Sequence, residues 1–337
     1  MSESQANRPV SNAGQAYQAP LTRTHFSPRY WGTWAGLGML WLLHRLPRFL
    51  LRGPVAALAW LLRIGSPKRR RIAAINLSLC FPELTTEQRD GLLRDHYRSS
   101  ARSMLDYGML WFGSPDTHAA RIRLVGDEHY QRLQERKTPV IVLAPHSVAL
   151  DHGGLRMSQI HDGVSFAKPI RNPVVEWINH RSRTRYSGDI FTREQGLRPA
   201  IRQIRKGRFF YYLPDEDLGE EGAVFADFFG VPKATLTALG RLARLTGAAV
   251  LPSFAFYDQA RDEYVLKLWP PLESFPDGDK EVDARAMNAA IEAAIREHPA
   301  QYLWTMRIFR TRPAGSTQPY REGPGKSRSL GAPRWKL

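Results

Sequence analysis

Short apolar runs that end at prolines constrain the fold of this chain more than any other feature of its sequence. The run Val140–Ala144 (VIVLA) lies between two prolines, and Phe209–Leu213 (FFYYL) also ends at one. Uninterrupted apolar runs of this length are typical of strands that are buried on both faces of a parallel sheet. We expect two further strands, at Ala248–Phe256 and Tyr264–Leu268.

Helical stretches separate the predicted strands. Within residues 84–112, two threonines provide a start signal and apolar residues then recur at helical spacing. Further helices are expected over Pro173–Arg185, Gly196–Lys206, Lys233–Thr246 and Asp283–His298. Strands that alternate with helices predict an α/β domain with a mixed, mostly parallel sheet flanked by helices.

The positive charge of the chain is concentrated at its two ends. Its 48 basic and 32 acidic residues give a formal net charge of +16 over 337 residues. Residues 1–82 hold 11 basic residues and one acid, residues 313–337 hold five and one, and 83–312 carry only +2. A nucleic-acid-binding domain carries its excess charge on the folded body, so we expect no nucleic acid partner. The single cysteine, Cys80, excludes a multi-cysteine zinc site.

The segment 28–72 is predicted to anchor the chain to a membrane. Its apolar run Tyr30–Leu43 has 14 residues, fewer than the ~20 that cross a bilayer. A second apolar run, Pro54–Leu62, and the basic cluster Lys68–Arg71 follow. Two membrane arrangements remain open, a short tilted span with its basic flank on the cytoplasmic side, or helices lying in the interface. A buried helix pair of a soluble protein is the alternative.

The two ends of the chain are expected to lie outside the folded domain. Residues 1–27 are polar and lack the features of a secretory signal, so they are interpreted as a disordered leader. Residues 73–312 form the predicted α/β domain, and residues 313–337 are rich in Pro, Gly, Ser and basic residues and are interpreted as a disordered tail.

A histidine and an aspartate follow the first predicted strand. The segment His146–Gly154 (HSVALDHGG) begins one proline after Val140–Ala144, and ligands usually bind where strands of an α/β sheet end. If a helix begins here, Asp151 lies a little over one turn from His146 and its carboxylate can hold the imidazole. Because an imidazole with a pKa near ~6.5 acts as a general base at neutral pH, this pair is the candidate catalytic pair.

Three alternatives compete with this interpretation. A serine hydrolase using Ser147 lacks the G-x-S-x-G motif. A metal site formed by His146, Asp151, His152 and His161 lacks the spacing of a helical zinc motif, and we expect no metal. A purely structural His–Asp pair is the third, since this spacing is common by chance.

Two charged features lie near the predicted strand ends. Pro214–Gly219 (PDEDLG) follows the strand Phe209–Leu213, and its three carboxylates require partners. Residues 168–208 hold 11 basic residues and three acids, with a cluster of alternating arginines at Arg181–Arg185. Arginines beside a general base favour an anionic substrate that guanidinium groups bind by two hydrogen bonds.

Four blocks of this sequence, in order, resemble the late acyltransferases of lipid A biosynthesis in Gram-negative bacteria. They are PRYWGTWAGLGMLWLLHRLP, APHSVALDHGG, RSRTR with YYLPDEDLGEEGAVFADFFGVPKATLTALGRLARLTGAAVLP, and QYLWTMRIFRTRP. The resemblance extends from about Pro28 to Pro313 and implies a glycerolipid-acyltransferase-like fold. It implies transfer of an acyl chain from an acyl carrier protein thioester to the 3-hydroxyl of an acyl chain on a Kdo-lipid A precursor, without a cofactor.

The resemblance also implies roles for individual residues. His146 would take the proton of the acceptor hydroxyl, and Asp151 would orient it. Arg183 and Asp215 would form a second polar pair that binds substrate. The further substrate-binding candidates are Arg171, Arg185 and Asp217. Phe225, Phe228 and Phe229 are either the lining of an acyl tunnel or ordinary core aromatics.

The expected partners follow from the same resemblance. They are an acyl carrier protein, a phosphorylated lipid A precursor and anionic membrane lipids, with the catalytic domain on the cytoplasmic face of the inner membrane. A glycerophospholipid acyltransferase of the same fold and a non-catalytic membrane scaffold are the competing interpretations.

Overall fold

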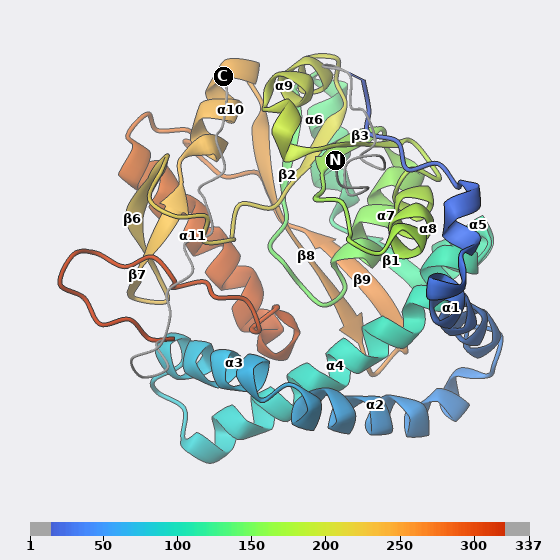
Figure 1. Ribbon diagram of the computed structural model, residues 1–337. Helices are drawn as coiled ribbons and strands as arrows, with labels where there is room; N and C mark the ends of the chain where they lie inside the picture. Colours follow the sequence, from blue (N-terminus) through green and yellow to red (C-terminus); the bar gives the residue numbers. More distant parts are fainter. Residues whose placement is uncertain (1–14, 321–337) are drawn as a thin grey trace, which may run out of the picture.

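A mixed seven-stranded sheet forms the centre of the computed structural model, which describes residues 15–320 (Figure 1). The strand order is β1-β9-β8-β2-β5-β3-β4, and only β8 and β9 pair antiparallel. The strands are β1 (Ile122–Val125), β2 (Val140–Leu143), β3 (Gly163–Phe166), β4 (Gly188–Phe191), β5 (Phe209–Tyr212), β8 (Ala249–Asp258) and β9 (Glu263–Leu268). The prediction of a mixed, mostly parallel sheet is therefore confirmed.

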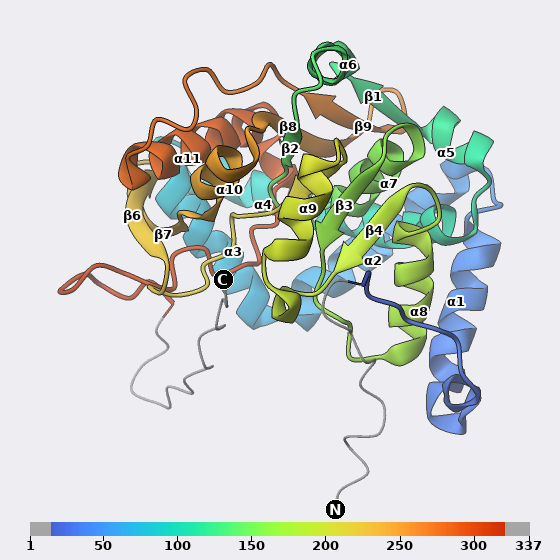
Figure 2. The ribbon, with the colours of Figure 1, turned by 90° about the horizontal axis from the view of Figure 1, so that it is seen from above.

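Helices cover both faces of this sheet. In β2, Ile141 and Leu143 face one apolar layer, whereas Val140 and Val142 face the other. The first layer is formed by α3 (Pro67–Cys80), α9 (Arg198–Arg205), α10 (Ala238–Thr246) and α11 (Lys280–Glu297). The second is formed by α6 (Asp127–Glu135), α7 (Leu150–Ile160) and the carboxyl-terminal part of α4 (Thr86–Phe112). Figure 2 shows α10 and α11 on one side of the central strands and α7 and α8 (Pro173–Arg183) on the other.

The predicted helix Lys233–Thr246 is wrong in its first part. Residues Val231–Leu236 form strand β7, which pairs antiparallel with β6 (Ala223–Phe228), and α10 begins only at Ala238. The turn between the strands contains Gly230 at a φ of 74°, in the left-handed region that glycine adopts without a steric cost. The strands β1 (IRLV), β3 (GVSF) and β4 (GDIF) were not predicted, because none of them is an uninterrupted apolar run. Each is ordered by pairing with neighbouring strands.

Three amino-terminal helices lie along one edge of the molecule. The helix α1 (Trp31–Leu43), the short η4 (Arg48–Leu51) and α2 (Arg52–Gly65) precede α3, and both α1 and α2 pack on α4 (Figure 1). Within residues 15–320, no individual helix has the length and apolarity of a membrane span. Two consecutive helical segments, Arg48–Gly65 and Pro67–Cys80, meet at a bend of 91°. Only by their combined length and composition do they resemble a membrane span.

The outer sides of α1, η4 and α2 expose large apolar side chains. They include Trp31, Met39, Leu42, Phe49, Trp60, Leu61 and Ile64. Basic groups lie among them, and the Arg45 guanidinium stacks 3.9 Å from the Trp41 ring centroid. We call the surface formed by these residues the amino-terminal apolar surface.

The described parts of both expected disordered ends are packed on the domain. Tyr17 is buried, its backbone N–H donates to the Ile190 carbonyl at 2.7 Å, and its own carbonyl accepts from His180 Nε2. Because Ile190 lies in the edge strand β4, this segment covers an edge that would otherwise be unpaired. Tyr320 is also buried, and its hydroxyl donates to Asn76 Oδ1 at 2.5 Å. The remaining residues of those two expected segments, 1–14 and 321–337, lie outside the described residues.

Two adjacent glycines on α7 are expected to differ in how substitution by alanine changes the free energy of unfolding. A Cβ atom at Gly153 would lie 2.7 Å from the Ala255 Cβ on β8, whereas one at Gly154 would meet no atom closer than 3.6 Å. Overpacking at Gly153→Ala is expected to lower the free energy of unfolding by about 1–3 kcal/mol. Gly154→Ala is expected to be neutral or to raise it by up to about 1 kcal/mol. Urea unfolding monitored by circular dichroism measures both, and equal losses would contradict the prediction.

Candidate active site

His146 is held by Asp215, from the neighbouring strand end. The imidazole Nδ1–H donates to Asp215 Oδ1 at 2.7 Å, and the backbone N–H of His146 donates to Asp215 Oδ2 at 2.8 Å. The Tyr302 hydroxyl donates to the same Oδ2 at 3.0 Å. Asp215 is 1% exposed, so these three donors fix a buried carboxylate.

The expected direct pairing of His146 with Asp151 is wrong. The chain does not become helical at His146, since α7 begins at Leu150. Residues 146–148 are instead extended along the carboxyl-terminal segment. Leu303 N–H donates to the His146 carbonyl, and Val148 N–H donates to the Gln301 carbonyl, each at 2.9 Å. This pairing fixes the direction of the His146 side chain before the helix begins.

Asp151 instead binds Arg183. The second expected pair, Arg183 with Asp215, is therefore also wrong. Arg183 directs its Nε and Nη2 to Asp151 Oδ1, both at 2.8 Å, and the Tyr107 hydroxyl donates to Oδ2 at 2.5 Å. Arg183 is the last residue of α8 and Asp151 lies in the first turn of α7. The structure therefore contains the four predicted polar residues as two different pairs, His146 with Asp215 and Asp151 with Arg183.

Both pairs lie at one cavity of about 290 Å³, which we call the His146 cavity. His146, Asp151 and Arg183 line it directly, whereas Asp215 lies behind His146. Most of the remaining wall is apolar, with residues from β3, β5 and α7. The apolar lining includes Leu150, Leu155, Val164, Phe166, Phe209 and Tyr211. A largely apolar wall with convergent polar groups is typical of a small-molecule site.

A second carboxylate lies on the open side of the imidazole. Glu216 Oε1 is 3.9 Å from His146 Nε2, and Glu216 Oε2 accepts from Arg193 at 2.6 Å. Glu216 and Arg193 both line the His146 cavity. Beneath the site, Lys233 is fully buried, and its ammonium makes no hydrogen bond within residues 15–320.

The surroundings shift the pKa values of this pair in opposite directions. Burial alone lowers the pKa of the His146 imidazole, but the carboxylates of Asp215 and Glu216 outweigh it and raise that pKa above 6.5. Burial raises the pKa of Asp215, but the His146 ring and its hydrogen bonds outweigh burial and hold the Asp215 pKa below 3.8. Asp215 is thus ionised and holds the proton on Nδ1, which leaves Nε2 of the neutral imidazole free to accept a proton.

The Asp151–Arg183 pair is stably charged. Burial raises the pKa of Asp151, but the Arg183 guanidinium and the Tyr107 hydroxyl outweigh it, so this pKa lies below 3.8. Burial lowers the pKa of Arg183, but the Asp151 carboxylate outweighs it and raises this pKa above its ordinary value. Arg183 therefore presents a permanent positive charge to the His146 cavity.

The other predicted substrate-binding residues do not line this cavity. Arg185 donates to the Gly113 carbonyl at 2.7 Å. Asp217 accepts from the backbone and hydroxyl of Thr311, at 2.6 and 2.7 Å, and so holds the carboxyl-terminal segment. Arg171 is exposed in the loop after β3, near Lys168, which does line the cavity.

The three candidate tunnel aromatics also lie away from the His146 cavity. Phe228 and Phe229 are buried core residues that stack edge to face, and Phe225 is 40% exposed. The alternative of ordinary core aromatics therefore describes Phe228 and Phe229.

The residues of the serine and metal alternatives do not assemble into either site. Ser147 pairs with Tyr302 in an isolated β-bridge, and its hydroxyl makes no hydrogen bond within the described residues. The His152 ring stacks on Tyr264 at 3.7 Å, and His161 Nε2 bonds to Asp127 at 2.7 Å. The ring nitrogens of His146, His152 and His161 thus have three separate surroundings.

A signal for the Asp215 partner is present in the sequence. β2 and β5 pair in parallel with Leu143 opposite Tyr212. His146 and Asp215 each follow three residues later, and each comes directly after a proline. Two neighbouring strands with the same spacing place their polar residues at one edge of the sheet. Tyr107, Arg193 and Tyr302 had no such signal, since they reach the site from distant segments.

Similarity to known proteins bears on the identity of the chain. A family model for bacterial lipid A biosynthesis acyltransferases matches residues 21–311. A lipid A biosynthesis acyltransferase of Haemophilus influenzae is 34% identical over 317 residues, covering 94% of this chain and 98% of that protein. The lipid A biosynthesis myristoyltransferase of Escherichia coli K12 is 34% identical, covering 87% and 91%. The lauroyltransferase of the same organism is 32% identical, covering 87% and 96%.

Proposed function

Because the chain belongs to the bacterial lipid A biosynthesis acyltransferases, we propose that it transfers an acyl group from an acyl carrier protein thioester to a hydroxyl of a lipid A precursor. The observation that supports this most is the free Nε2 of His146, which faces a largely apolar cavity while Asp215 holds Nδ1. The arrangement suits a hydroxyl nucleophile supplied by the substrate.

His146 acts as the general base in this proposal. Nε2 takes the proton of the acceptor hydroxyl while the hydroxyl oxygen bonds to the thioester carbonyl carbon. The carbon–sulfur bond then breaks, the new ester forms, and the proton passes from the imidazolium to the departing thiolate. Asp215 keeps the imidazole in the reactive tautomer and stabilises the imidazolium.

Arg183 stabilises the negative charge that develops during the transfer. Its guanidinium lines the same cavity as His146 and is fixed by Asp151, which in turn accepts from the Tyr107 hydroxyl. A fixed cation at the developing oxyanion lowers the barrier because it needs no reorganisation during the reaction. The apolar walls from β3 and β5 hold part of an acyl chain.

The chain is proposed to lie at the cytoplasmic face of the inner membrane and to attach through the amino-terminal apolar surface. Trp31 is 65% and Trp60 is 61% exposed, and arginines and lysines flank them. Such a mixture suits helices in the interface of an anionic leaflet. In this proposal the acceptor is embedded in the same leaflet and reaches the His146 cavity from the membrane.

The membrane attachment is testable with two pairs of substitutions. Trp31→Ser with Trp60→Ser is expected to weaken co-sedimentation with anionic vesicles by at least about tenfold, since two large apolar groups leave the interface. Leu245→Ser with Val282→Ser is the control, because these residues are 45% and 51% exposed on the opposite helices α10 and α11. Equal binding by the two variants would contradict this mode of attachment.

The reaction itself is testable with purified protein. The acceptors are a tetra-acylated Kdo-lipid A precursor and a lysophospholipid, and the donors are acyl carrier protein thioesters of different chain lengths and the matching coenzyme A thioesters. The expected product is a lipid A precursor whose mass is increased by one acyl group, formed from the carrier protein thioester. Acylation of the lysophospholipid alone would support the glycerophospholipid alternative and contradict the proposal.

A further inference from the structure

A second cavity, of about 490 Å³, lies between η4 and α2, α4 and the turn that joins β8 to β9. It is lined by four arginines, which are Arg48, Arg52, Arg98 and Arg102. Among its lining residues, all within the described part of the chain, Asp262 is the single carboxylate. We call it the arginine cavity, and no residue of the His146 cavity lines it.

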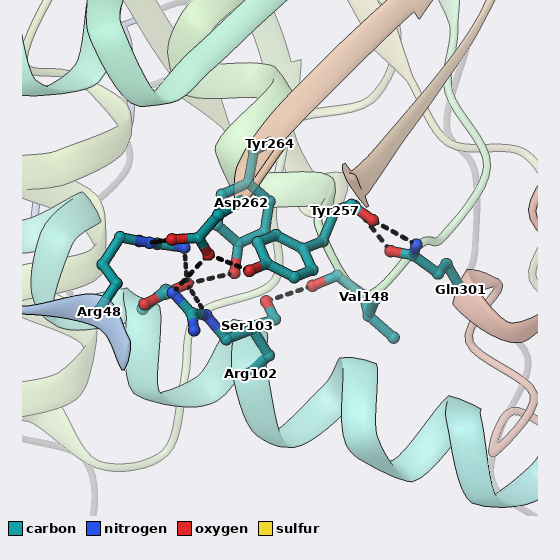
Figure 3. A network of polar contacts seen from close by, with 9 residues as sticks. Arg48, Arg102, Ser103, Val148, Tyr257, Asp262, Tyr264 and Gln301 are labelled. Atoms are coloured by element: carbon teal, nitrogen blue, oxygen red, sulfur yellow. Dashed lines mark hydrogen bonds and ion pairs between the residues drawn. The ribbon is translucent and has the colours of Figure 1, made fainter. Parts of the chain in front are cut away.

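Two of the arginines form a fixed floor (Figure 3). Arg48 Nε donates to Asp262 Oδ2 at 2.7 Å, and Arg102 Nε donates to Asp106 Oδ2 at 2.7 Å. The hydroxyls of Tyr257 and Tyr264 donate to Asp262 and Asp106 respectively. Figure 3 shows Arg48 and Arg102 converging from two elements on the same carboxylates. This network holds both guanidinium groups in place before a ligand arrives.

One donor of this floor is unused. Arg102 is 6% exposed, and its Nη2 makes no hydrogen bond within residues 15–320. It lies 3.4 Å from Asp262 Oδ1, near enough for charge attraction only. A buried donor without an acceptor is destabilising, so an acceptor at this position would be stabilising.

The other two arginines leave the mouth of the cavity positive. Arg52 takes part in no ion pair among the described residues, and its side chain is exposed. Arg98 lies 3.1 Å from Asp95, but both side chains are more than half exposed, so the pair neutralises little. The floor carboxylates balance Arg48 and Arg102, and the excess charge therefore comes from Arg52 and Arg98.

We propose that the arginine cavity binds a phosphate group, with Arg52 and Arg98 at its mouth and Arg102 Nη2 at its floor. Planar guanidinium groups match phosphate oxygens by paired hydrogen bonds, and the Ser99 hydroxyl and Gln259 amide add uncharged donors. The rim residue Phe49 is 64% exposed and belongs to the amino-terminal apolar surface. A phosphate carried by a lipid would thus have apolar protein surface beside it.

Hydrogen bonds connect the wall of the arginine cavity to the extended segment 146–148, which carries His146. The side-chain oxygen of Gln301 accepts from the Tyr257 N–H at 2.7 Å, and its side-chain amide donates to the Tyr257 carbonyl at 2.8 Å. The backbone carbonyl of Gln301 accepts from the Val148 N–H. Ser103, next to Arg102, donates to the Val148 carbonyl at 2.5 Å (Figure 3). These bonds make the wall rigid, and a preformed site loses little entropy on binding.

The test compares two double variants of the full-length protein. Arg52→Gln with Arg98→Gln removes the two positive charges at the mouth of the cavity. Arg63→Gln with Arg94→Gln is the matched control, because it removes the same charge from the same helices α2 and α4 at residues that do not line the cavity. Binding is measured by calorimetry with glycerol 3-phosphate in solution, and by co-sedimentation with phosphatidylcholine vesicles with or without phosphatidylglycerol.

The first variant is expected to lose phosphate-dependent binding by at least about tenfold, while the control loses less than about threefold. Loss in the vesicle experiment alone identifies a lipid headgroup as the ligand, and loss in the calorimetric experiment identifies a soluble phosphate ester; either result supports the site. Equal losses in both variants, or no phosphate-dependent binding by the unmodified protein, would overturn it. Because the readout is binding, this result is independent of the acyl-transfer proposal.

Discussion

His146→Gln is expected to reduce acyl transfer by about 10²–10⁴-fold, the contribution of a positioned general base. Glutamine keeps a polar side chain of similar length but cannot take up a proton at neutral pH. The fold is expected to survive, because Asp215 still accepts from the backbone N–H of residue 146 and from the Tyr302 hydroxyl. Initial rates with a lipid A precursor and an acyl carrier protein thioester measure the effect.

A second histidine provides the control for this substitution. His129 lies on α6, outside the lining of the His146 cavity. His129→Gln makes the same chemical change and should retain nearly full activity. An active His146→Gln variant, with near-ultraviolet circular dichroism like that of the unmodified protein, would rule out His146 as the base.

Asp215→Asn is expected to lower the rate by about 10²–10⁴-fold and to move the pH profile. The neutral imidazole is the active form, so the rate should rise with pH through the pKa of His146. In the unmodified protein that pKa is raised above 6.5, with Asp215 as the main cause that raises it. Removing the Asp215 charge lowers the pKa, so the midpoint of the profile should move to lower pH.

Asp151→Asn distinguishes the two carboxylates. It releases the Arg183 guanidinium and should also lower the rate, but the His146 ring does not bond to Asp151. The midpoint of its pH profile should therefore stay near that of the unmodified protein. If Asp151→Asn moves the midpoint and Asp215→Asn does not, the observed pairing is not the one that operates in catalysis.

The apolar strands were predictable because burial on both faces leaves a local signature. Val140–Ala144 and Phe209–Leu213 were each predicted to within one residue of β2 and β5. Strands β3 (GVSF) and β4 (GDIF) carry no such signature, and they are strands because they pair with β5 and with each other. The first part of the helix predicted over Lys233–Thr246 was wrong for a related reason, since the pairing of β7 with β6 outweighed the local helical pattern.

The polar residues of the site were predictable as a set, but their pairing was not. All four of them were identified from the sequence. His146, Asp151 and Arg183 line one cavity, and Asp215 forms a hydrogen bond with His146. Arg185 and Asp217 were grouped with them by sequence proximity alone. The structure instead uses both to hold neighbouring backbone.

The sequence by itself determined which residues end the buried strands, because a proline followed by a polar side chain stops an apolar run wherever it occurs. Only the tertiary structure decided which carboxylate holds His146. Parallel pairing of β2 with β5 brings Asp215 beside it, 69 positions away in the chain. Asp151, five positions away, is turned toward Arg183 because the extended segment 146–148 separates His146 from the start of α7. Strand register, a long-range property, outweighed proximity along the chain.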